Sequence, residues 1–286
     1  MGYFIGIDGG GTGCRVAVAD PSGKQLGRAE GGAANIATDL ARAQANILET
    51  TARAFDAAGV HRSRMGSSSA VLGLAGANLQ DARMRLLANL PFARQRVVSD
   101  GETTLVGAIG PEDGVIGALG TGSVYASQTG GVFRQLGGWG FQLGDDGSGA
   151  RLGRDMLHRA ILAHDSIVPH SPLTREIMAE YQGSPRALVD AARGFSPKDF
   201  GQFAPRIVAA ADANDANAEA IMAQHTALVR KSLNAAGFAP TRAFCMLGGL
   251  GPIFLARLPE RYRSAARTPR GTALDGAVAM AVLAFA

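Results

Sequence analysis

The chain has 286 residues and a net charge of +4; 18% of its residues are charged, 6% are aromatic and 39 are glycine. This profile is typical of a globular α/β protein with many tight turns, and it excludes disordered and fibrous classes. The basic residues are scattered and do not alternate with aromatic residues, so neither nucleic acid nor a membrane is an expected partner. No apolar run approaches the ~18 residues of a membrane span and no signal-peptide pattern is present, so we expect a cytoplasmic protein.

Cysteine and histidine give no metal-binding pattern. Cys14 and Cys245 are the only cysteines and lie far apart, which excludes a Cys-x-x-Cys pair, and the five histidines show no ligand spacing. We therefore expect a reduced protein with no structural zinc.

The first predicted feature in chain order is a motif of three strands that occurs twice. Residues 5–27 and 115–137 align so that Gly11-Thr12-Gly13 falls on Gly120-Thr121-Gly122, and each copy ends in Gln-Leu-Gly. Each copy predicts a strand, a Gly/Thr turn, a second strand, another turn and a third strand. Two such halves facing one another would place one glycine turn on each wall of a cleft.

Strand and helix signals alternate between the two copies. Thr38 is a candidate N-cap for a helix that ends near Gly59, and a strand at 69–74, a helix at 81–90 and a strand at 96–99 follow. The apolar positions of the first helix recur every three or four residues: Leu40, Ala43, Ile47, Thr51 and Phe55. This alternation favours a partly parallel sheet.

The chain after the second copy is mainly helical. We expect helices at 150–164 and 272–284, one or two helices at 205–236, and a strand at 243–247. No segment resembles a linker or a low-complexity tract.

The first glycine turn, Asp8-Gly9-Gly10-Gly11-Thr12-Gly13, carries the strongest chemical signal. The N–H groups of Gly10 and Gly11 and the hydroxyl of Thr12 can approach an anion closely. Asp8, at the end of the strand, can hold a Mg²⁺ ion that bridges phosphates. A tight hairpin with nothing bound is the alternative, but three consecutive glycines are more than a hairpin requires. The pattern favours phosphate binding.

The second glycine turn consists of Gly120, Thr121, Gly122 and Ser123. Alone it would equally suit a plain hairpin, but as the repeat partner of the first turn it becomes a second candidate phosphate site. Two donor-rich turns around one phosphate chain would stabilise phosphoryl transfer.

Asp100 directly follows a short predicted strand. Ligands of open α/β sheets bind at the carboxyl ends of strands, and a carboxylate there can accept the proton of an attacking hydroxyl. Asp is also a favoured helix N-cap, here for the segment 101–109, and position alone does not separate these two interpretations.

Residues 137–149, GGWGFQLGDDGSG, contain two acids among six glycines and cannot form the interior of a regular element. A polar loop of this kind, which begins at Gly137 and Gly138 and ends at a helix N-terminus at Ser148, can hold sugar hydroxyls, with Trp139 as an apolar wall. The alternative is a mobile surface loop in which Ser148 only caps a helix.

Residues 247–252, LGGLGP, join a strand to a helix. Gly248, Gly249 and Gly251 can let an adenine ring lie against the backbone, although taken alone the segment favours a simple turn. The sequence contains no P-loop, protein-kinase catalytic loop, H-E-x-x-H or G-x-S-x-G motif, and no G-x-G-x-x-G after the first strand.

Together these motifs resemble the actin-like ATPase superfamily and, within it, the N-acetylglucosamine kinase group, which includes bacterial glucosamine kinases and has a BadF/BadG-type ATPase domain. IGIDGGGT and GALGTGS look like the two phosphate motifs, LGGLGP stands where the adenosine motif is expected, and GGWG with GDDGS resembles the sugar loop. PHSPL and FGQFAP look more like bacterial glucosamine kinases, whereas GGWG leans towards mammalian N-acetylglucosamine kinases, so the substrate stays open.

The resemblance covers almost the whole chain and implies a kinase that uses ATP and Mg²⁺ to phosphorylate the 6-hydroxyl of N-acetylglucosamine or glucosamine. It assigns the catalytic base to Asp100, the sugar contacts to Asn35, Asp100 and Asp145, and the metal to Asp8. Relatives of this kind are commonly homodimers.

The fold that the resemblance implies is α/β, with two ribonuclease-H-like domains and an active-site cleft between them. The N-terminal domain is expected at 1–108 together with 272–286, and the C-terminal domain at 109–271.

Four other functions are less consistent with the sequence. A nucleotide-driven switch or chaperone shares the phosphate motifs but would have a peptide-binding domain in place of the sugar loop. An activator of acyl-CoA dehydratases needs clustered cysteines for an iron–sulfur centre, a zinc-containing glucokinase needs a Cys-rich loop, and a sugar-responsive repressor needs an N-terminal helix-turn-helix, yet the phosphate motif begins at Ile5.

Overall fold

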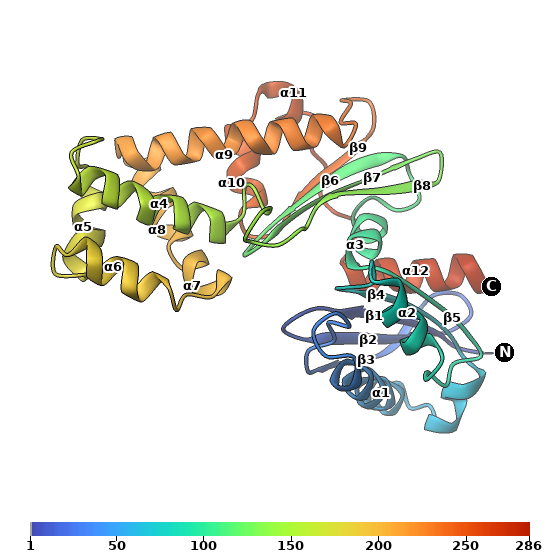
Figure 1. Ribbon diagram of the computed structural model, residues 1–286. Helices are drawn as coiled ribbons and strands as arrows, with labels where there is room; N and C mark the ends of the chain where they lie inside the picture. Colours follow the sequence, from blue (N-terminus) through green and yellow to red (C-terminus); the bar gives the residue numbers. More distant parts are fainter. Residues whose placement is uncertain (1) are drawn as a thin grey trace. The chain divides into compact units, whose positions relative to one another are not determined.

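The computed structural model describes residues 2–286, which fall into two compact units (Figure 1). Unit 1 contains the described residues up to Asp113 together with Gln128–Phe133 and Thr268–Ala286. Unit 2 contains Gly114–Ser127 and Arg134–Arg267. Each unit has its own buried core. The domain boundaries at 108 and 272 remain a prediction about folding units.

A five-stranded sheet forms the centre of unit 1, in the order β3-β2-β1-β4-β5. Its strands are β1 (Phe4–Gly9), β2 (Cys14–Ala19), β3 (Gln25–Gly31), β4 (Ser69–Leu74) and β5 (Arg94–Ser99). Strand β1 pairs antiparallel with β2 and parallel with β4, and β4 pairs parallel with β5. The partly parallel sheet predicted from the alternating pattern is confirmed.

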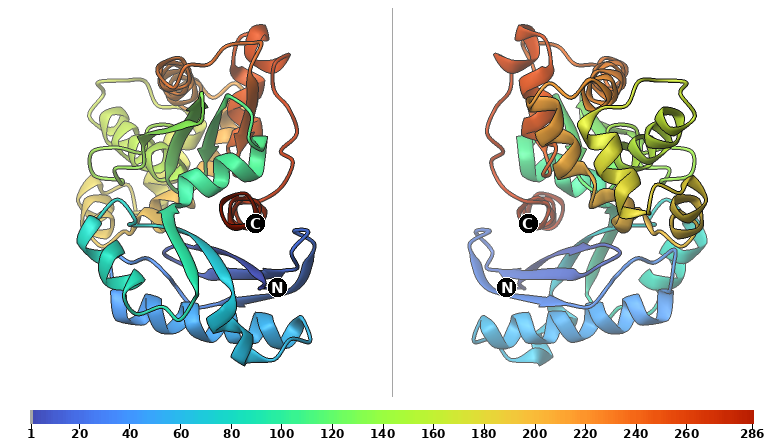
Figure 2. Two further views of the ribbon diagram at one scale, coloured as in Figure 1. Left: turned by 90° about the vertical axis from the view of Figure 1, so that its right-hand side faces the viewer. Right: turned by 90° about the vertical axis from the view of Figure 1, so that its left-hand side faces the viewer.

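Helices cover both faces of this sheet (Figure 2). The helical segments of unit 1 are α1 (Leu40–Ala57), η1 (Arg62–Ser67), α2 (Gln80–Leu87), α3 (Asp100–Ile109) and α12 (Ala273–Phe285). On one face, Ile47 of α1 and Leu86 of α2 belong to the same apolar cluster as Ile7 of β1. On the other face, Val278 of α12 packs with Phe4 and Val71, and α3 lies against α12.

Two predicted helix ends in unit 1 are wrong. The N-cap of α1 is Asp39, whose carboxylate accepts the N–H of Arg42 at 3.0 Å, while Thr38 lies in the preceding turn. Helix α2 ends at Leu87 and not at residue 90, because Pro91 disfavours helical backbone at the residue before it.

Strand β5 also begins earlier than predicted, at Arg94. Its first residues pair with β4 although they are charged or polar, so an apolar pattern does not reveal them.

The second copy of the repeat forms β6 (Gly114–Leu119), β7 (Ser123–Thr129) and β8 (Val132–Gly137). With β9 (Ala243–Leu247) these strands make a four-stranded sheet in the order β8-β7-β6-β9, in which β6 and β9 are parallel. Because the first copy has the matching order β3-β2-β1, the predicted internal repeat is confirmed.

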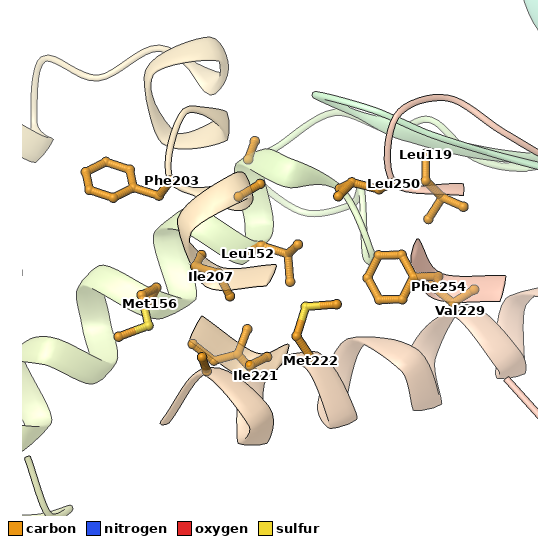
Figure 3. Close-up of a cluster of buried hydrophobic side chains, with 14 of the residues drawn as sticks. Leu119, Leu152, Met156, Phe203, Ile207, Ile221, Met222, Val229, Leu250 and Phe254 are labelled. Carbon is orange, nitrogen blue, oxygen red and sulfur yellow. The ribbon is translucent and has the colours of Figure 1, made fainter. Parts of the chain in front are cut away.

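Helices make up most of the rest of unit 2. They are α4 (Gly149–His164), α5 (Pro172–Glu180), α6 (Pro185–Ala192), α7 (Pro197–Gly201), α8 (Ala204–Asp212), α9 (Ala216–Ala235), α10 (Gly251–Arg257) and α11 (Glu260–Arg263). The predicted segment 205–236 is two helices, because Asn214 takes a positive φ of 63° and Asp215 caps α9. The apolar side chains of α4, α8 and α9 meet in one core, in which Met156, Ile207 and Ile221 lie close together (Figure 3).

Three of these helices, α5, α6 and α7, were not predicted. Each begins with a serine N-cap followed by proline, at Ser171, Ser184 and Ser196. A Ser-Pro pair is a recognisable helix start, because the serine hydroxyl accepts a free backbone N–H and proline lacks one.

The contact between α3 and α12 depends on two glycines. A Cβ added at Gly107 would lie 1.9 Å from the carbonyl oxygen of Thr272, and one added at Gly276 would lie 2.1 Å from that of Thr103. Any larger residue at either position therefore separates the two helices.

We expect Gly276→Ala to lower the free energy of unfolding by about 1–3 kcal/mol, the usual cost of overpacking. Equilibrium urea denaturation measures this change. Gly66→Ala is the control, because its Cβ would have no neighbour closer than 3.7 Å. Equal stability of the two variants would contradict the close packing of α3 on α12.

Candidate functional site

The first glycine turn joins β1 to β2 in unit 1. It is closed by the N–H of Gly10, which donates to the carbonyl of Gly13 at 2.9 Å, and the carbonyl of Gly10 accepts the N–H of Ala34 at 2.9 Å. A Cβ added at Gly10 or Gly11 would meet nothing within 4 Å. Space beside these two backbone positions is therefore open to a ligand.

A cavity of about 600 Å³ lies beside this turn, a size usual for small-molecule sites. Asp8, Gly10, Thr12 and Asp100 all line it. The structure thus brings the predicted phosphate turn, the predicted metal ligand and the predicted base to one cavity of unit 1.

Asp100 is neither the last residue of β5 nor a helix N-cap. The N-cap is Ser99, whose hydroxyl accepts the N–H of Glu102 at 3.2 Å, and Asp100 is the first residue of α3. Its carboxylate accepts the N–H of Gly101 at 2.9 Å. Burial raises the pKa of the Asp100 carboxyl, an effect that this hydrogen bond opposes only in part. A carboxylate with a raised pKa is a stronger base than a solvated one.

Asp8 is only 8% exposed and forms an ion pair with Arg15 at 2.5 Å. Burial raises the pKa of the Asp8 carboxyl, Arg15 opposes this shift, and the charge of Asp100 adds to it. The two carboxylates therefore repel one another across the cavity, and a bound cation would relieve that repulsion.

Sequence reasoning missed Arg15, although the signal was present. In an antiparallel pair closed by a short turn, the residues on either side of the turn face each other, and β1 and β2 pair Asp8 with Arg15. A positive charge beside the predicted phosphate turn follows from that register.

The residues around the cavity fit a magnesium ion. Magnesium takes one or two carboxylates from the protein and completes its shell with water and phosphate oxygens. Asp8 supplies one such carboxylate at the cavity, whereas among residues 2–286 no cluster of three or more His, Cys, Asp or Glu side chains offers a complete protein-made metal site.

Asn35 lies in the loop between β3 and α1. Its side-chain oxygen accepts the N–H of Ala37 at 2.9 Å, and Asn35 is partly buried. It does not line the cavity of Asp8 and Asp100.

The second glycine turn, in unit 2, is tied to two neighbouring segments. The N–H groups of Gly149 and Ala150, at the start of α4, donate to the carbonyls of Gly120 and Thr121 at 2.8 and 3.2 Å. The N–H of Leu250 donates to the carbonyl of Leu119 at 3.0 Å. The β6–β7 turn, the start of α4 and the LGGLGP segment therefore form one structure.

A cavity of about 490 Å³ opens beside this structure and has mostly apolar walls. Its lining includes Gly120, Thr121, Gly149, Gly249, Leu250, Val208 and Ile253. A Cβ at Gly120 or Gly249 would meet nothing within 4 Å, so both positions leave space for a ligand. An apolar pocket with a donor-rich turn at its edge suits a flat base joined to a phosphate chain.

The other two LGGLGP glycines are required by packing. Gly248 has a φ of 77° and its Cβ would lie 2.2 Å from the carbonyl oxygen of Leu119, while that of Gly251 would lie 2.9 Å from the backbone of Met246.

The glycine-rich loop, residues 137–147, is folded onto the start of β7. Asp145 takes a positive φ of 62°, and its carboxylate accepts the N–H groups of Gly140 and Ser123. Burial raises the pKa of the Asp145 carboxyl despite these bonds. The hydroxyl of Ser123 donates to the carbonyl of Asp146 at 2.9 Å, so in this structure it holds the loop. A Cβ at Gly122 would lie 2.9 Å from the Asp145 carboxylate.

Other predicted loop residues are open to solvent. Trp139 is 78% exposed, while Gly138 has a φ of 71°. Ser148 caps α4, as predicted, and accepts the N–H of Arg151 at 3.2 Å.

Comparison with known proteins finds an ATPase family and relatives that are named as amino-sugar kinases. Residues 5–252 match the model of the BadF/BadG/BcrA/BcrD ATPase family. The chain is 30% identical over 282 residues to glucosamine kinase GspK of Vibrio cholerae serotype O1, covering 98% of this chain and 96% of that protein. It is 29% identical over 171 residues to an N-acetylmuramic acid/N-acetylglucosamine kinase of Clostridium acetobutylicum, and this match covers 58% of this chain and 55% of that protein.

A solved structure proposed to be an N-acetylglucosamine kinase, from Chromobacterium violaceum, superposes with a TM-score of 0.86 and 33% identity, covering 97% of this chain and 98% of that one. This similarity confirms the predicted fold class. Within residues 2–286, no helix is both long enough and apolar enough to span a bilayer.

The raised pKa of Asp100 has a consequence for stability. Because the folded pKa lies above the unfolded value of about 4, the charged carboxylate destabilises the fold at neutral pH, and this cost fades as pH falls through the folded pKa. We expect Asp100→Asn to raise the thermal midpoint at pH 7, by roughly 2–4 °C for each kcal/mol relieved, and the gain to shrink towards pH 4. Differential scanning calorimetry at pH 7 and at pH 4 measures the thermal midpoint at each pH. Asp165→Asn, at an exposed position, is the control. A lower midpoint for Asp100→Asn at pH 7 would contradict a carboxylate whose charged form is disfavoured by removal from water.

Proposed function

Because this chain belongs to the BadF/BadG/BcrA/BcrD ATPase family, we propose that it is a kinase that transfers the γ-phosphoryl group of ATP to the 6-hydroxyl of an amino sugar. The acceptor is glucosamine or N-acetylglucosamine, the sugars that the names of its relatives contain. The observation that carries the proposal is the convergence of Asp100, Asp8 and the first glycine turn on one cavity.

Asp100 is proposed as the general base. Its pKa is raised by burial, so it takes up a proton more readily than an exposed carboxylate. Asp100 accepts the proton of the sugar hydroxyl. The electron pair left on the sugar oxygen forms the new bond to the γ-phosphorus, and the bond between that phosphorus and the oxygen that bridges it to the β-phosphate breaks. ADP leaves with the electrons of the broken bond.

The nucleotide is proposed to bind unit 2 through the 490 Å³ cavity, with its base against Val208, Leu250 and Ile253. Gly120, Thr121 and Gly122 bind its phosphates through backbone N–H groups and the threonine hydroxyl. The support is an apolar pocket that ends at a turn with open space beside Gly120. Gly10, Gly11 and Thr12 are assigned to phosphate oxygens on the same grounds.

The sugar contacts are proposed to be Asn35, Asp100, Gly138, Trp139 and Asp145. The carboxylates can accept hydrogen bonds from sugar hydroxyls, and the amide of Asn35 can both accept and donate them. The exposed indole of Trp139 offers an apolar face for a sugar ring. Mg²⁺, held by Asp8, would neutralise charge on the phosphates when it is bound. Arg15 holds the Asp8 carboxylate in place.

The homodimer and the cytoplasmic location are part of this proposal. So are folding domains at 1–108 with 272–286 and at 109–271. Light scattering coupled to size-exclusion chromatography tests whether the protein is a homodimer.

The experiment that tests the function is ADP release with glucosamine, N-acetylglucosamine, glucose and N-acetylmannosamine, each with and without Mg²⁺. We expect a strong Mg²⁺-dependent rate with one of the first two sugars. A rate that does not depend on any sugar would point to a nucleotide-driven switch or ATPase activator of the same superfamily.

Asp100→Asn should reduce kcat with that sugar about 10²–10⁴-fold, the usual contribution of a general base. The thermal midpoint of the variant should not fall, which separates loss of chemistry from loss of fold. Asp165→Asn, at the exposed residue that follows α4, should keep full activity. Near-normal turnover of Asp100→Asn would remove the assignment of the base.

Gly249→Val should raise the KM for ATP at least about tenfold, because the new side chain enters a cavity that nothing in the fold occupies. The KM for the sugar and the thermal midpoint without ligand should stay close to those of the parent. An unchanged KM for ATP would place the base of the nucleotide elsewhere.

A further inference from the structure

A buried histidine lies behind the glycine-rich loop. His225, on α9, has no exposed surface. Its Nε2 is 2.9 Å from the carboxylate of Asp155 on α4, and its Nδ1 is 3.1 Å from the backbone nitrogen of Gly147, the last residue of the loop. One side chain thus connects two core helices to a loop that carries Asp145.

The chemistry of these partners fixes the proton on the ring. A backbone N–H can only donate, so Nδ1 must accept, and the ring proton must lie on Nε2. Nε2–H then donates to Asp155. Burial raises the pKa of the Asp155 carboxyl, but the hydrogen bond from His225 and the nearby Arg151 and Arg154 outweigh burial and hold the pKa below its ordinary value. Asp155 therefore stays ionised and keeps the ring in this tautomer.

Gly147 is buried against the core of unit 2. Its φ is 85°, and an added Cβ would lie 2.6 Å from Val229 and 2.8 Å from Leu119, two side chains of the unit 2 core (Figure 3). A buried N–H without an acceptor is costly, so loss of His225 Nδ1 would force the end of the loop to move.

The loop is held from both sides at this point. On the β7 side, Ser123 and Tyr125 donate their hydroxyls to the carbonyl of Asp146 at 2.9 and 3.3 Å. On the core side, His225 holds Gly147. Asp145 directly precedes the two anchored residues, Asp146 and Gly147. The N–H of Ser148, which follows them, donates to the carbonyl of Asp145 at 3.0 Å, so a shift of Gly147 changes where the Asp145 carboxylate points.

We propose that His225, oriented by Asp155, is a positioning residue that sets the Asp145 carboxylate for the hydroxyls of the acceptor sugar. The inference rests on the proposed function for the identity of that ligand. The hydrogen bond to Gly147 carries the effect, and the bond to Asp155 orients the ring that makes it.

Two amide substitutions separate the two hydrogen bonds of His225. Asn places its oxygen where Nδ1 lies and can still accept from Gly147, whereas Gln places its amide nitrogen near Nε2 and can still donate to Asp155. We expect His225→Gln to raise the KM for the sugar at least about tenfold with little change in the KM for ATP, because a buried N–H loses its acceptor. His225→Asn should recover most of that loss. His164→Gln, at the exposed end of α4, is the matched control.

Two readouts do not require catalysis. Trp139 is the only tryptophan of the chain, lies in the loop and is exposed, so its fluorescence reports the state of the loop and its response to added sugar. Hydrogen exchange of the peptide containing Gly147 should be slow in the parent and in His225→Asn, and fast in His225→Gln.

The outcomes separate the two hypotheses. If the parent shows neither sugar-dependent ADP release nor a sugar-dependent change in Trp139 fluorescence, the proposed function fails, while hydrogen exchange still tests the anchor. If the parent responds to sugar but His225→Gln and His225→Asn behave alike in KM and exchange, His225 is only a packing residue and the inference is overturned.

Discussion

The close contact of α3 with the sheet and with α12 is the constraint on which the candidate site of unit 1 depends. Three glycines allow it: besides Gly107 and Gly276, a Cβ at Gly73 of β4 would lie 2.1 Å from the hydroxyl oxygen of Thr103. Because Asp100 is the first residue of α3, the depth of that helix decides how far its carboxylate is removed from water. The raised pKa of Asp100 is a consequence of this packing.

The two copies of the repeat share a backbone and differ in chemistry. In the first copy, Asp8 is the next-to-last residue of β1 and is paired with Arg15, so the turn has charged groups beside it. In the second copy the matching position is Gly117, where a Cβ would lie 3.0 Å from the sulfur of Met246, so the second turn has no carboxylate at this position. The first turn therefore has the carboxylates of Asp8 and Asp100 and the guanidinium of Arg15 at its cavity, whereas the second turn has a mostly apolar cavity beside it.

Much of this could be predicted from the sequence, because the repeat and the glycine turns are local patterns. The six strands of the repeat, the strand at 243–247 and the start of α4 at Ser148 follow from such signals. Helix ends were less predictable: Thr38 and Asp39 are both good caps, and only the three-dimensional path of the chain selects Asp39.

The residues that sequence reasoning missed act across the sheet or the core. Arg15 becomes visible only when β1 and β2 are paired in register, and His225 is joined to Gly147 across 78 residues of sequence. A lone histidine on a helix face gives no sign of such a partner. The hydroxyl of Ser123, which the sequence assigns to phosphate, donates in this structure to the carbonyl of Asp146, and its phosphate contact stays a prediction.

The most direct test of the account is the identity of the product. A proton–phosphorus correlation spectrum of the protein with ATP, Mg²⁺ and the amino sugar that best stimulates ADP release should show the new phosphorus signal coupled to the two protons on carbon 6 of the sugar. A spectrum in which the only new signals are those of ADP and inorganic phosphate would contradict an amino-sugar kinase.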